Sequence, residues 1–223
     1  MSSSDRHLVE LHNVEMKSSR GESIFRDLNL TIEAGATALV AGSSGTGKTS
    51  LLDLIIGRRF PDSGSVEVFG KVLRKRRKRH LRAVRRRIGG IGGRFELVPS
   101  MTVSDNILLP LVISGERRAI QRELLHQILA ELSLTSLAGD YPHELTRVQY
   151  TLAQVARATV ANQPLILIDE PAAGLDQGTL ARVFEYLFKM AVSGRAMLIV
   201  CSELPVHKLP GAREYRLSEG MLI

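Results

Sequence analysis

The stretch Gly42-Ser43-Ser44-Gly45-Thr46-Gly47-Lys48-Thr49 matches the pattern G-x-x-x-x-G-K-[ST] of a phosphate-binding loop. Residues 36–41 before it predict a short buried strand, and residues 50–56 after it predict the first turns of a helix. Glycines allow backbone N–H groups to converge on phosphate oxygens, and the start of a helix adds the positive end of its dipole. This context favours a nucleotide site over a glycine-rich turn that happens to precede a lysine.

The loop residues have expected roles. All eight, together with Ser50, are candidate nucleotide-binding residues. The ammonium of Lys48 is expected to reach the β- and γ-phosphates, and the hydroxyl of Thr49 is expected to bind Mg²⁺.

An acidic pair supplies the second half of the predicted site. Asp169 and Glu170 follow Leu165-Ile166-Leu167-Ile168, a continuous apolar run typical of a strand buried on both faces. A carboxylate at that strand end, here Asp169, can hold Mg²⁺ through water, and Glu170 can polarise a water against the γ-phosphate. The alternative is an ordinary acidic pair at a strand end, but its occurrence together with a phosphate loop favours a catalytic site.

Length and composition suit one large α/β domain or one domain with an inserted lobe. The chain has 223 residues, of which 44% are hydrophobic. Cys201 is the one cysteine, so an intramolecular disulfide is excluded and a reducing compartment is expected. Residues 1–6 contain no apolar segment, and no apolar run approaches the roughly 18 residues of a membrane span. We therefore expect neither a signal peptide nor a transmembrane helix.

A basic segment accounts for the whole net charge of +7. Ten of the 30 Lys and Arg lie between Arg74 and Arg87 without an acid, and the other 20 face 23 Asp and Glu. The segment fits a solvated face, a contact with anionic membrane headgroups, or a nucleic-acid contact. Nucleic acid is disfavoured because no aromatic side chain interrupts the run to stack on bases.

Strands that alternate with helices predict an α/β fold with a mainly parallel sheet. Strands are expected at 7–14, 28–33, 36–41, 66–69, 165–168, 197–200, 213–217 and 221–223. Helices are expected from residue 50, after Thr102 or Ser104, at 117–132, at about 149–161 and at 179–192. Because residues 97–161 carry no strand signal, they predict a helical lobe inserted into the sheet domain.

Together these motifs resemble the ATP-binding subunits of ABC transporters over residues 8–223. The stretches Arg86-Arg87-Ile88-Gly89 and Thr102-Val103-Ser104-Asp105-Asn106 are most similar to the bacterial FtsE/LolD/macrolide-exporter branch. The stretch from Asp169 to Asp176 resembles the family's Walker B strand and D-loop. The stretch Ala156-Arg157-Ala158 resembles the end of its signature helix.

The resemblance implies a single nucleotide-binding domain across residues 1–223, a P-loop NTPase of RecA-like type with an antiparallel β lobe. The core and β lobe would comprise about 1–93 and 162–223, and the helical lobe about 94–161. It also implies ATP and Mg²⁺ as cofactors. The resemblance adds Asp169 and Asp176 to the candidate nucleotide-binding residues. Thr49 and Asp169 are the candidate metal ligands, and Glu170 is the candidate catalytic residue.

The resemblance further implies two kinds of partner. In the family, two subunits enclose two ATP molecules and drive a transmembrane permease. We therefore expect a homodimer or heterodimer of nucleotide-binding subunits, in the cytoplasm and peripheral on the inner face of the cell membrane.

Four family features are missing from this sequence. The signature Leu-Ser-Gly-Gly-Gln aligns with Leu145-Thr146-Arg147-Val148-Gln149, which lacks both glycines. The Q-loop glutamine falls on Gly93 and the switch histidine on Ser202, while His207 lies five residues late. The aromatic residue that stacks on adenine falls near Ser18.

These losses leave two main hypotheses open. The chain is either an active ATPase subunit, expected to be weak as an isolated homodimer, or a non-hydrolysing regulatory subunit. A third hypothesis, a soluble ABC protein that acts on nucleic acid, is disfavoured because such proteins usually carry two of these domains.

Overall fold

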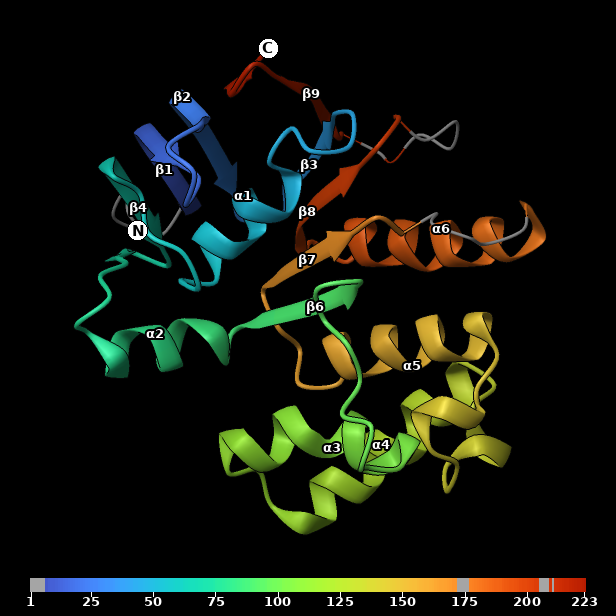
Figure 1. Cartoon of the computed structure of the whole chain (residues 1–223). Coiled ribbons are helices and arrows are strands. Elements are labelled where there is room, and N and C mark those ends of the chain that lie inside the picture. Colours follow the sequence, from blue (N-terminus) through green and yellow to red (C-terminus); the bar gives the residue numbers. More distant parts are fainter. Residues whose placement is uncertain (1–6, 172–176, 205–208, 210) are drawn as a thin grey trace.

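Two sheets enclose helix α1 in the computed structural model, which describes residues 7–171, 177–204, 209 and 211–223 (Figure 1). The antiparallel sheet has the order β2-β1-β4-β5, and the other has the order β10-β9-β3-β8-β7-β6. In the second sheet β3, β6, β7, β8 and β9 are parallel, and β10 is antiparallel to β9. The predicted α/β class with a mainly parallel core is therefore confirmed.

The strands of the first sheet are β1 (His7–Lys17), β2 (Ser23–Glu33), β4 (Ser63–Val68) and β5 (Lys71–Val72). Those of the second are β3 (Thr37–Ala41), β6 (Ile88–Gly92), β7 (Leu165–Asp169), β8 (Ala196–Cys201), β9 (Arg213–Ser218) and β10 (Met221–Leu222). The helices are α1 (Lys48–Ile55), α2 (Lys78–Arg85), α3 (Val103–Ser114), α4 (Arg118–Glu131), α5 (Arg147–Thr159) and α6 (Gln177–Val192). Short 3₁₀ turns lie at Thr135–Leu137 and Pro142–Glu144.

The central strands are apolar on both faces because each face packs on a separate core. Val40, Leu167 and Leu198 pack with α1 and the antiparallel sheet. The alternate residues of the same strands pack with α3, α5 and α6 on the other side. This two-sided burial explains the continuous apolar runs of the sequence.

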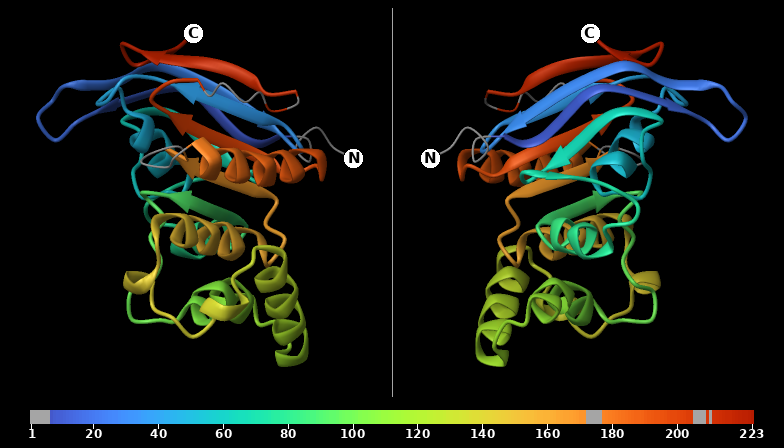
Figure 2. Two further views of the ribbon diagram at one scale, coloured as in Figure 1. Left: turned by 90° about the vertical axis from the view of Figure 1, so that its right-hand side faces the viewer. Right: turned by 90° about the vertical axis from the view of Figure 1, so that its left-hand side faces the viewer.

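The segment between β6 and β7 contains α3, α4 and α5, and it lies below the six-stranded sheet in Figures 1 and 2. Thr102, rather than Ser104, caps α3: its hydroxyl accepts a hydrogen bond from the Asp105 N–H at 3.1 Å. Across the described residues, no helix combines the length and the apolar character needed to cross a bilayer.

Three elements were not expected from the sequence, namely the two-residue strand β5, helix α2 and strand β6. Helix α2 lies within the basic segment, where only Leu81 and Val84 are buried. Strand β6 consists mostly of glycine, which has little intrinsic preference for strands. The structure shows why glycine is needed, because a side chain at Gly89 would overlap the carbonyl of Ala158, and one at Gly92 the carbonyl of Asp169.

Candidate functional site

The phosphate loop joins β3 to α1, as its sequence predicts. Gly45 and Gly47 adopt φ values of 85° and 105°, a left-handed conformation that side chains disfavour. No side chain caps the start of α1 at Gly47, so the first N–H groups of the helix are available to an anion. Because Ser43, Ser44 and Gly45 are exposed, phosphate can approach the loop from solvent.

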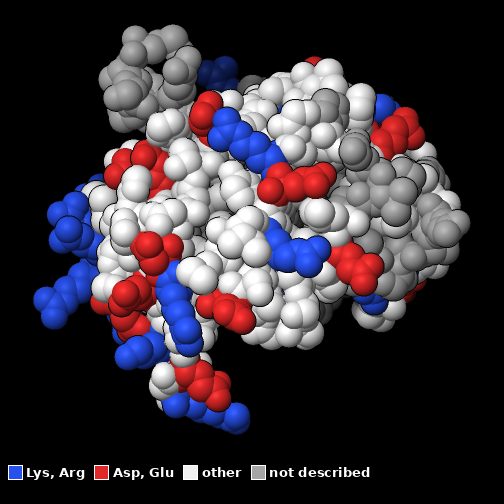
Figure 3. Space-filling model, turned by 90° about the horizontal axis from the view of Figure 1, so that it is seen from above, with Lys and Arg blue, Asp and Glu red and all other residues white. Residues whose placement is uncertain are grey.

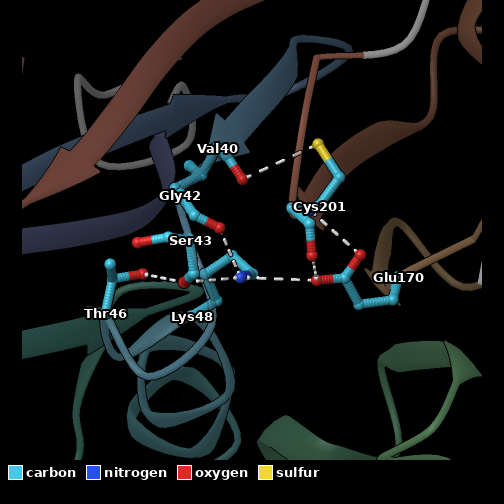
Figure 4. Close-up of polar contacts among 8 residues, drawn as sticks. Val40, Gly42, Ser43, Thr46, Lys48, Glu170 and Cys201 are labelled. Carbon is cyan, nitrogen blue, oxygen red and sulfur yellow. Dashed lines mark hydrogen bonds and ion pairs between the residues drawn. The ribbon is translucent and has the colours of Figure 1, made fainter.

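Lys48 lies beneath this loop with its ammonium group among acceptors (Figure 4). Its Nζ donates to the carbonyl oxygens of Gly42 at 2.5 Å and Ser43 at 3.1 Å. The same atom is 3.4 Å from Oε1 of Glu170, and the lysine side chain is 8% exposed. A buried cation is thus held where the loop would receive phosphate oxygens.

Glu170 is fixed from the opposite side of the site. Its N–H donates to the carbonyl of Val200 at 2.9 Å. Its carboxylate accepts hydrogen bonds from the N–H of Ser202 at 3.0 Å and from the Ser202 hydroxyl at 2.7 Å. Ser202, the position of the missing histidine, therefore orients the candidate catalytic carboxylate.

Asp169 ends β7, directly before Glu170, and pairs with Gly92 of β6. Burial, followed by repulsion from Glu170, raises the pKa of Asp169 above its ordinary value, against the opposing charges of Arg94 and Lys48. Arg94 is in turn bound to Asp53 of α1 through two hydrogen bonds of 3.2 and 2.5 Å.

The candidate metal ligands Thr49 and Asp169 lie near each other in the structure. Thr49, Asp169 and Glu170 line one cavity of about 600 Å³. No group of three or more His, Cys, Asp or Glu in the described part of the chain could hold a metal alone. This donor set suits Mg²⁺ that arrives with a nucleotide, since Mg²⁺ commonly uses one or two carboxylates together with substrate phosphates.

The signature segment faces the same cavity, which is also lined by Leu145, Arg147 and Gly93. Thr146 caps α5 by accepting from the Gln149 N–H at 3.3 Å. At Gly93 an added Cβ would meet no atom within 4 Å, so the position has room for a side chain. Asp176 and His207 lie outside the described residues.

Two side chains of α5 hold the loop that follows β6. The family motif includes Arg157 but does not predict this contact, and no motif includes Gln154. Gln154 donates to the carbonyl oxygens of Gly92 at 3.2 Å and Phe95 at 2.8 Å. Arg157 donates to those of Phe95 at 2.5 Å and Glu96 at 2.8 Å. The loop between the two predicted lobes is therefore anchored to α5.

Cys201 lies at the end of β8, close to this site. Its Sγ is 3.9 Å from the carbonyl oxygen of Val40. Burial, with a further contribution from Glu170, raises the pKa of Cys201 to about 11, so the thiol is neutral at physiological pH.

A parallel α/β sheet, a phosphate loop at a helix start and an acidic strand end define a P-loop nucleotide-binding domain. Residues 25–173 match the family described as ABC transporter. The chain is 30% identical over 222 residues to a macrolide export ATP-binding/permease protein, MacB, of Rhodopseudomonas palustris, covering 98% of this chain and 34% of that protein. It is also 31% identical to a methionine import ATP-binding protein, MetN, of Nocardia farcinica. That match covers 99% of this chain and 67% of the MetN protein.

A solved structure gives the same result. The dimeric ATP-binding cassette MJ0796, bound to ADP and phosphate, superposes with a TM-score of 0.83 at 27% identity, covering 96% of each chain. The chain therefore belongs to the ABC transporter ATP-binding family, whose domains bind ATP with Mg²⁺. It spans about a third of the length of the MacB relatives that it matches.

Proposed function

We propose that this chain is the ATP-binding subunit, or the ATP-binding part, of a membrane transport complex that couples nucleotide binding to a transmembrane permease. One observation carries the nucleotide site: the buried ammonium of Lys48 lies inside the phosphate loop and 3.4 Å from Glu170. The relatives are named for ATP binding together with macrolide export or methionine import, and this supports the transport role.

Different residues of the site contact different parts of the nucleotide and its metal ion. The first N–H groups of α1 and the loop bind phosphate oxygens, and Lys48 exchanges its carbonyl and carboxylate partners for phosphate. Thr49 and Asp169 would hold Mg²⁺, which neutralises phosphate charge when it is bound. Ser202 keeps the Glu170 carboxylate oriented to accept a proton from a water molecule.

Calorimetric titration tests this assignment. Lys48→Ala should weaken Mg·ATP binding by at least about tenfold, since a charge-assisted contact typically contributes about 1.5–3 kcal/mol. Lys71→Ala, which removes an exposed lysine of β5, is the matched control and should bind as the wild type does. Equal affinity of Lys48→Ala and wild type would show that the loop is not the nucleotide site.

We also propose that part of the basic segment contacts anionic lipid on the inner face of the cell membrane. All ten of its cations are exposed, and none forms an ion pair within the described residues. Arg85 and Arg87 have structural partners, namely the carbonyls of Ile56 and Gly57 and the ring of Phe69. Elsewhere, as on the face in Figure 3, basic and acidic side chains are interspersed.

A liposome assay tests the membrane contact. Replacement of Arg76, Arg77, Lys78 and Arg79 by Gln should reduce sedimentation with phosphatidylglycerol vesicles and leave Mg·ATP affinity unchanged. Binding of the wild type should fall as salt rises, because exposed charges are screened over about 8 Å at physiological ionic strength. If the wild type does not bind these vesicles at low salt, the segment is a solvated face.

A further inference from the structure

Arg59 connects the first turn of α1 with the end of β1. Its Nη1 donates to the hydroxyl oxygen of Ser50 at 3.0 Å, and its Nη2 donates to the carbonyl oxygen of Lys17 at 3.2 Å. Its backbone N–H donates to the carbonyl of Asp53 at 3.1 Å. The backbone of Arg59 is therefore fixed beyond the end of α1, and its side chain runs back to the phosphate-binding end of the same helix.

The positive charge of Arg59 is partly buried and has no carboxylate partner. Its side chain forms no ion pair within the part of the chain that the structure describes. Asp62, the nearest acid in the sequence, accepts a hydrogen bond from the N–H of Lys17 at 2.7 Å. Because removing a charge from water is costly without a counterion, the Arg59 guanidinium favours a negatively charged ligand beside Ser50.

Ser50 has two donors left for such a ligand. Its oxygen accepts from Arg59, and its hydroxyl hydrogen has no acceptor among the described residues. The first intrahelical hydrogen bond of α1 runs from the N–H of Leu51 to the carbonyl of Gly47, so the N–H of Ser50 is also free at the start of the helix. Both donors lie in the turn that directly follows the phosphate loop.

The position of Ser50 indicates which phosphate it would meet. The cavity lined by Thr49 and Glu170 marks the end of the site that receives the metal ion and the γ-phosphate, and Ser50 does not line that cavity. Arg59 joins Ser50 to the end of β1 instead. A nucleotide whose γ-phosphate faces Glu170 therefore places its α-phosphate, next to the nucleoside, on the Ser50 side.

We infer that Arg59 is a positioning residue for the nucleotide: it holds the Ser50 hydroxyl so that its hydrogen points to the α-phosphate. The charge of the guanidinium also strengthens that hydrogen bond. The inference rests on the proposed nucleotide site and adds to it a residue that no motif of the sequence contains. The neighbouring Arg58 offers a comparison, because its side chain is exposed and makes no hydrogen bond or ion pair with another described residue.

Calorimetric titration with Mg·ATP measures the contribution of Arg59. Arg59→Gln should weaken binding by about tenfold, as expected for the loss of a hydrogen bond that involves a charged group. Ser50→Ala should weaken it to a similar degree, and the double variant should bind no more weakly than Ser50→Ala, because Arg59 acts through that hydroxyl. Arg58→Gln is the matched control, which removes the same charge one residue away and should bind as the wild type does.

The two diastereomers of adenosine 5′-O-(1-thiotriphosphate) test the contact with the α-phosphate itself. Each carries sulfur, a weaker hydrogen-bond acceptor than oxygen, at a different non-bridging position of the α-phosphate. The wild type should bind one diastereomer about tenfold more weakly than the other, and Arg59→Gln and Ser50→Ala should each reduce this ratio to about threefold or less. A general loss of stability would weaken both diastereomers equally and leave the ratio unchanged.

The inference is overturned if the wild type binds both diastereomers alike, or if Arg59→Gln keeps the wild-type ratio. It is also overturned if Arg58→Gln weakens Mg·ATP binding as much as Arg59→Gln, because the effect would then come from positive charge in general. A wild type that binds Mg·ATP and fails these tests leaves the proposed function intact. Equal affinity of the wild type and Lys48→Ala would instead remove the nucleotide site and this inference together.

Discussion

Glu170 has a φ of 52°, a left-handed conformation uncommon for a residue with a side chain. Two hydrogen bonds from Ser202 and the ion pair with Lys48 accompany this strained backbone. Strain that is held by several contacts is a feature of functional sites. The carboxylate is therefore positioned before nucleotide binds, and nucleotide must compete with it for the ammonium of Lys48.

The raised pKa of Asp169 gives a prediction for pH. Metal ligands must be deprotonated, so Mg·ATP affinity should fall as pH is lowered through that pKa. The loss should begin above the range of an ordinary Asp, about pH 3.9, because burial and Glu170 favour the neutral carboxyl. The same shift means that the folded state binds this proton more tightly than the unfolded chain does, so protonation of Asp169 stabilises the fold.

Calorimetry across a pH series, on wild type and Asp169→Asn, isolates this effect from titration of the phosphates. Asn cannot titrate, so the variant should bind more weakly and lose the Asp169 component of the pH dependence. Parallel pH profiles for the two proteins would mean that Asp169 does not bind the metal.

Strand β6 illustrates how far the sequence predicts the elements. Strands β3, β7 and β8 could be predicted because burial on both faces requires continuous apolar runs. Strand β6 could not, since close contacts with α5 and β7 select glycine over the residues that favour strands. Helix α2 was missed for a different reason: it is short, and its apolar face consists of Leu81 and Val84 alone, so the basic segment could equally be a solvated loop.

The glycines of this segment give a prediction with an internal control. Gly92 has a φ of 94°, and a side chain there would overlap the Asp169 carbonyl. Gly92→Ala should therefore lower the free energy of unfolding by about 2 kcal/mol or more. Gly93→Ala, one residue later in open space, should change it by less than about 0.5 kcal/mol. Urea denaturation measures both, and equal losses would contradict the tight approach of β6 to β7.

In the nucleotide site, as in the secondary structure, local sequence predicts some features and not others. The loop residues, Asp169 and Glu170 were identified because each motif is continuous in the chain. The contacts of Ser202 with Glu170 and of Arg94 with Asp53 span 32 and 41 residues. Such contacts depend on the tertiary arrangement of strands and loops, so no local sequence pattern predicts them.

At the scale of the molecule, we propose that this chain supplies one well-formed half of a composite site. In the resembled family, a second subunit contributes its signature segment to each ATP. Here that segment begins α5 with Arg147 and Val148, where the family has two glycines. We propose the lobe boundaries near residues 93 and 162, because the loop anchored by Gln154 and Arg157 joins the sheet to the helices there.

A homodimer would therefore pair two complete phosphate loops with two altered signatures, and both sites would lack the Q-loop glutamine and the switch histidine. Loss of one preorganised group at a transition state commonly lowers the rate by roughly 10²–10³. We predict turnover well below about 1 s⁻¹ for the isolated protein, beneath the usual range of enzymes. Phosphate release under steady-state conditions measures this rate, with Glu170→Gln as the inactive reference.

Restoring the family residues together tests the cause of the low rate. Gly93 has room for glutamine, so Gly93→Gln should fold, and Ser202→His replaces the hydroxyl that now contacts Glu170. Arg147→Gly and Val148→Gly lie in the first turn of α5 and should each lower stability by up to about 1 kcal/mol. The combined variant should hydrolyse ATP faster than the wild type if the altered groups limit catalysis. Wild-type turnover at ordinary enzyme speed, abolished by Glu170→Gln, would instead show that this site does not need the missing groups for hydrolysis.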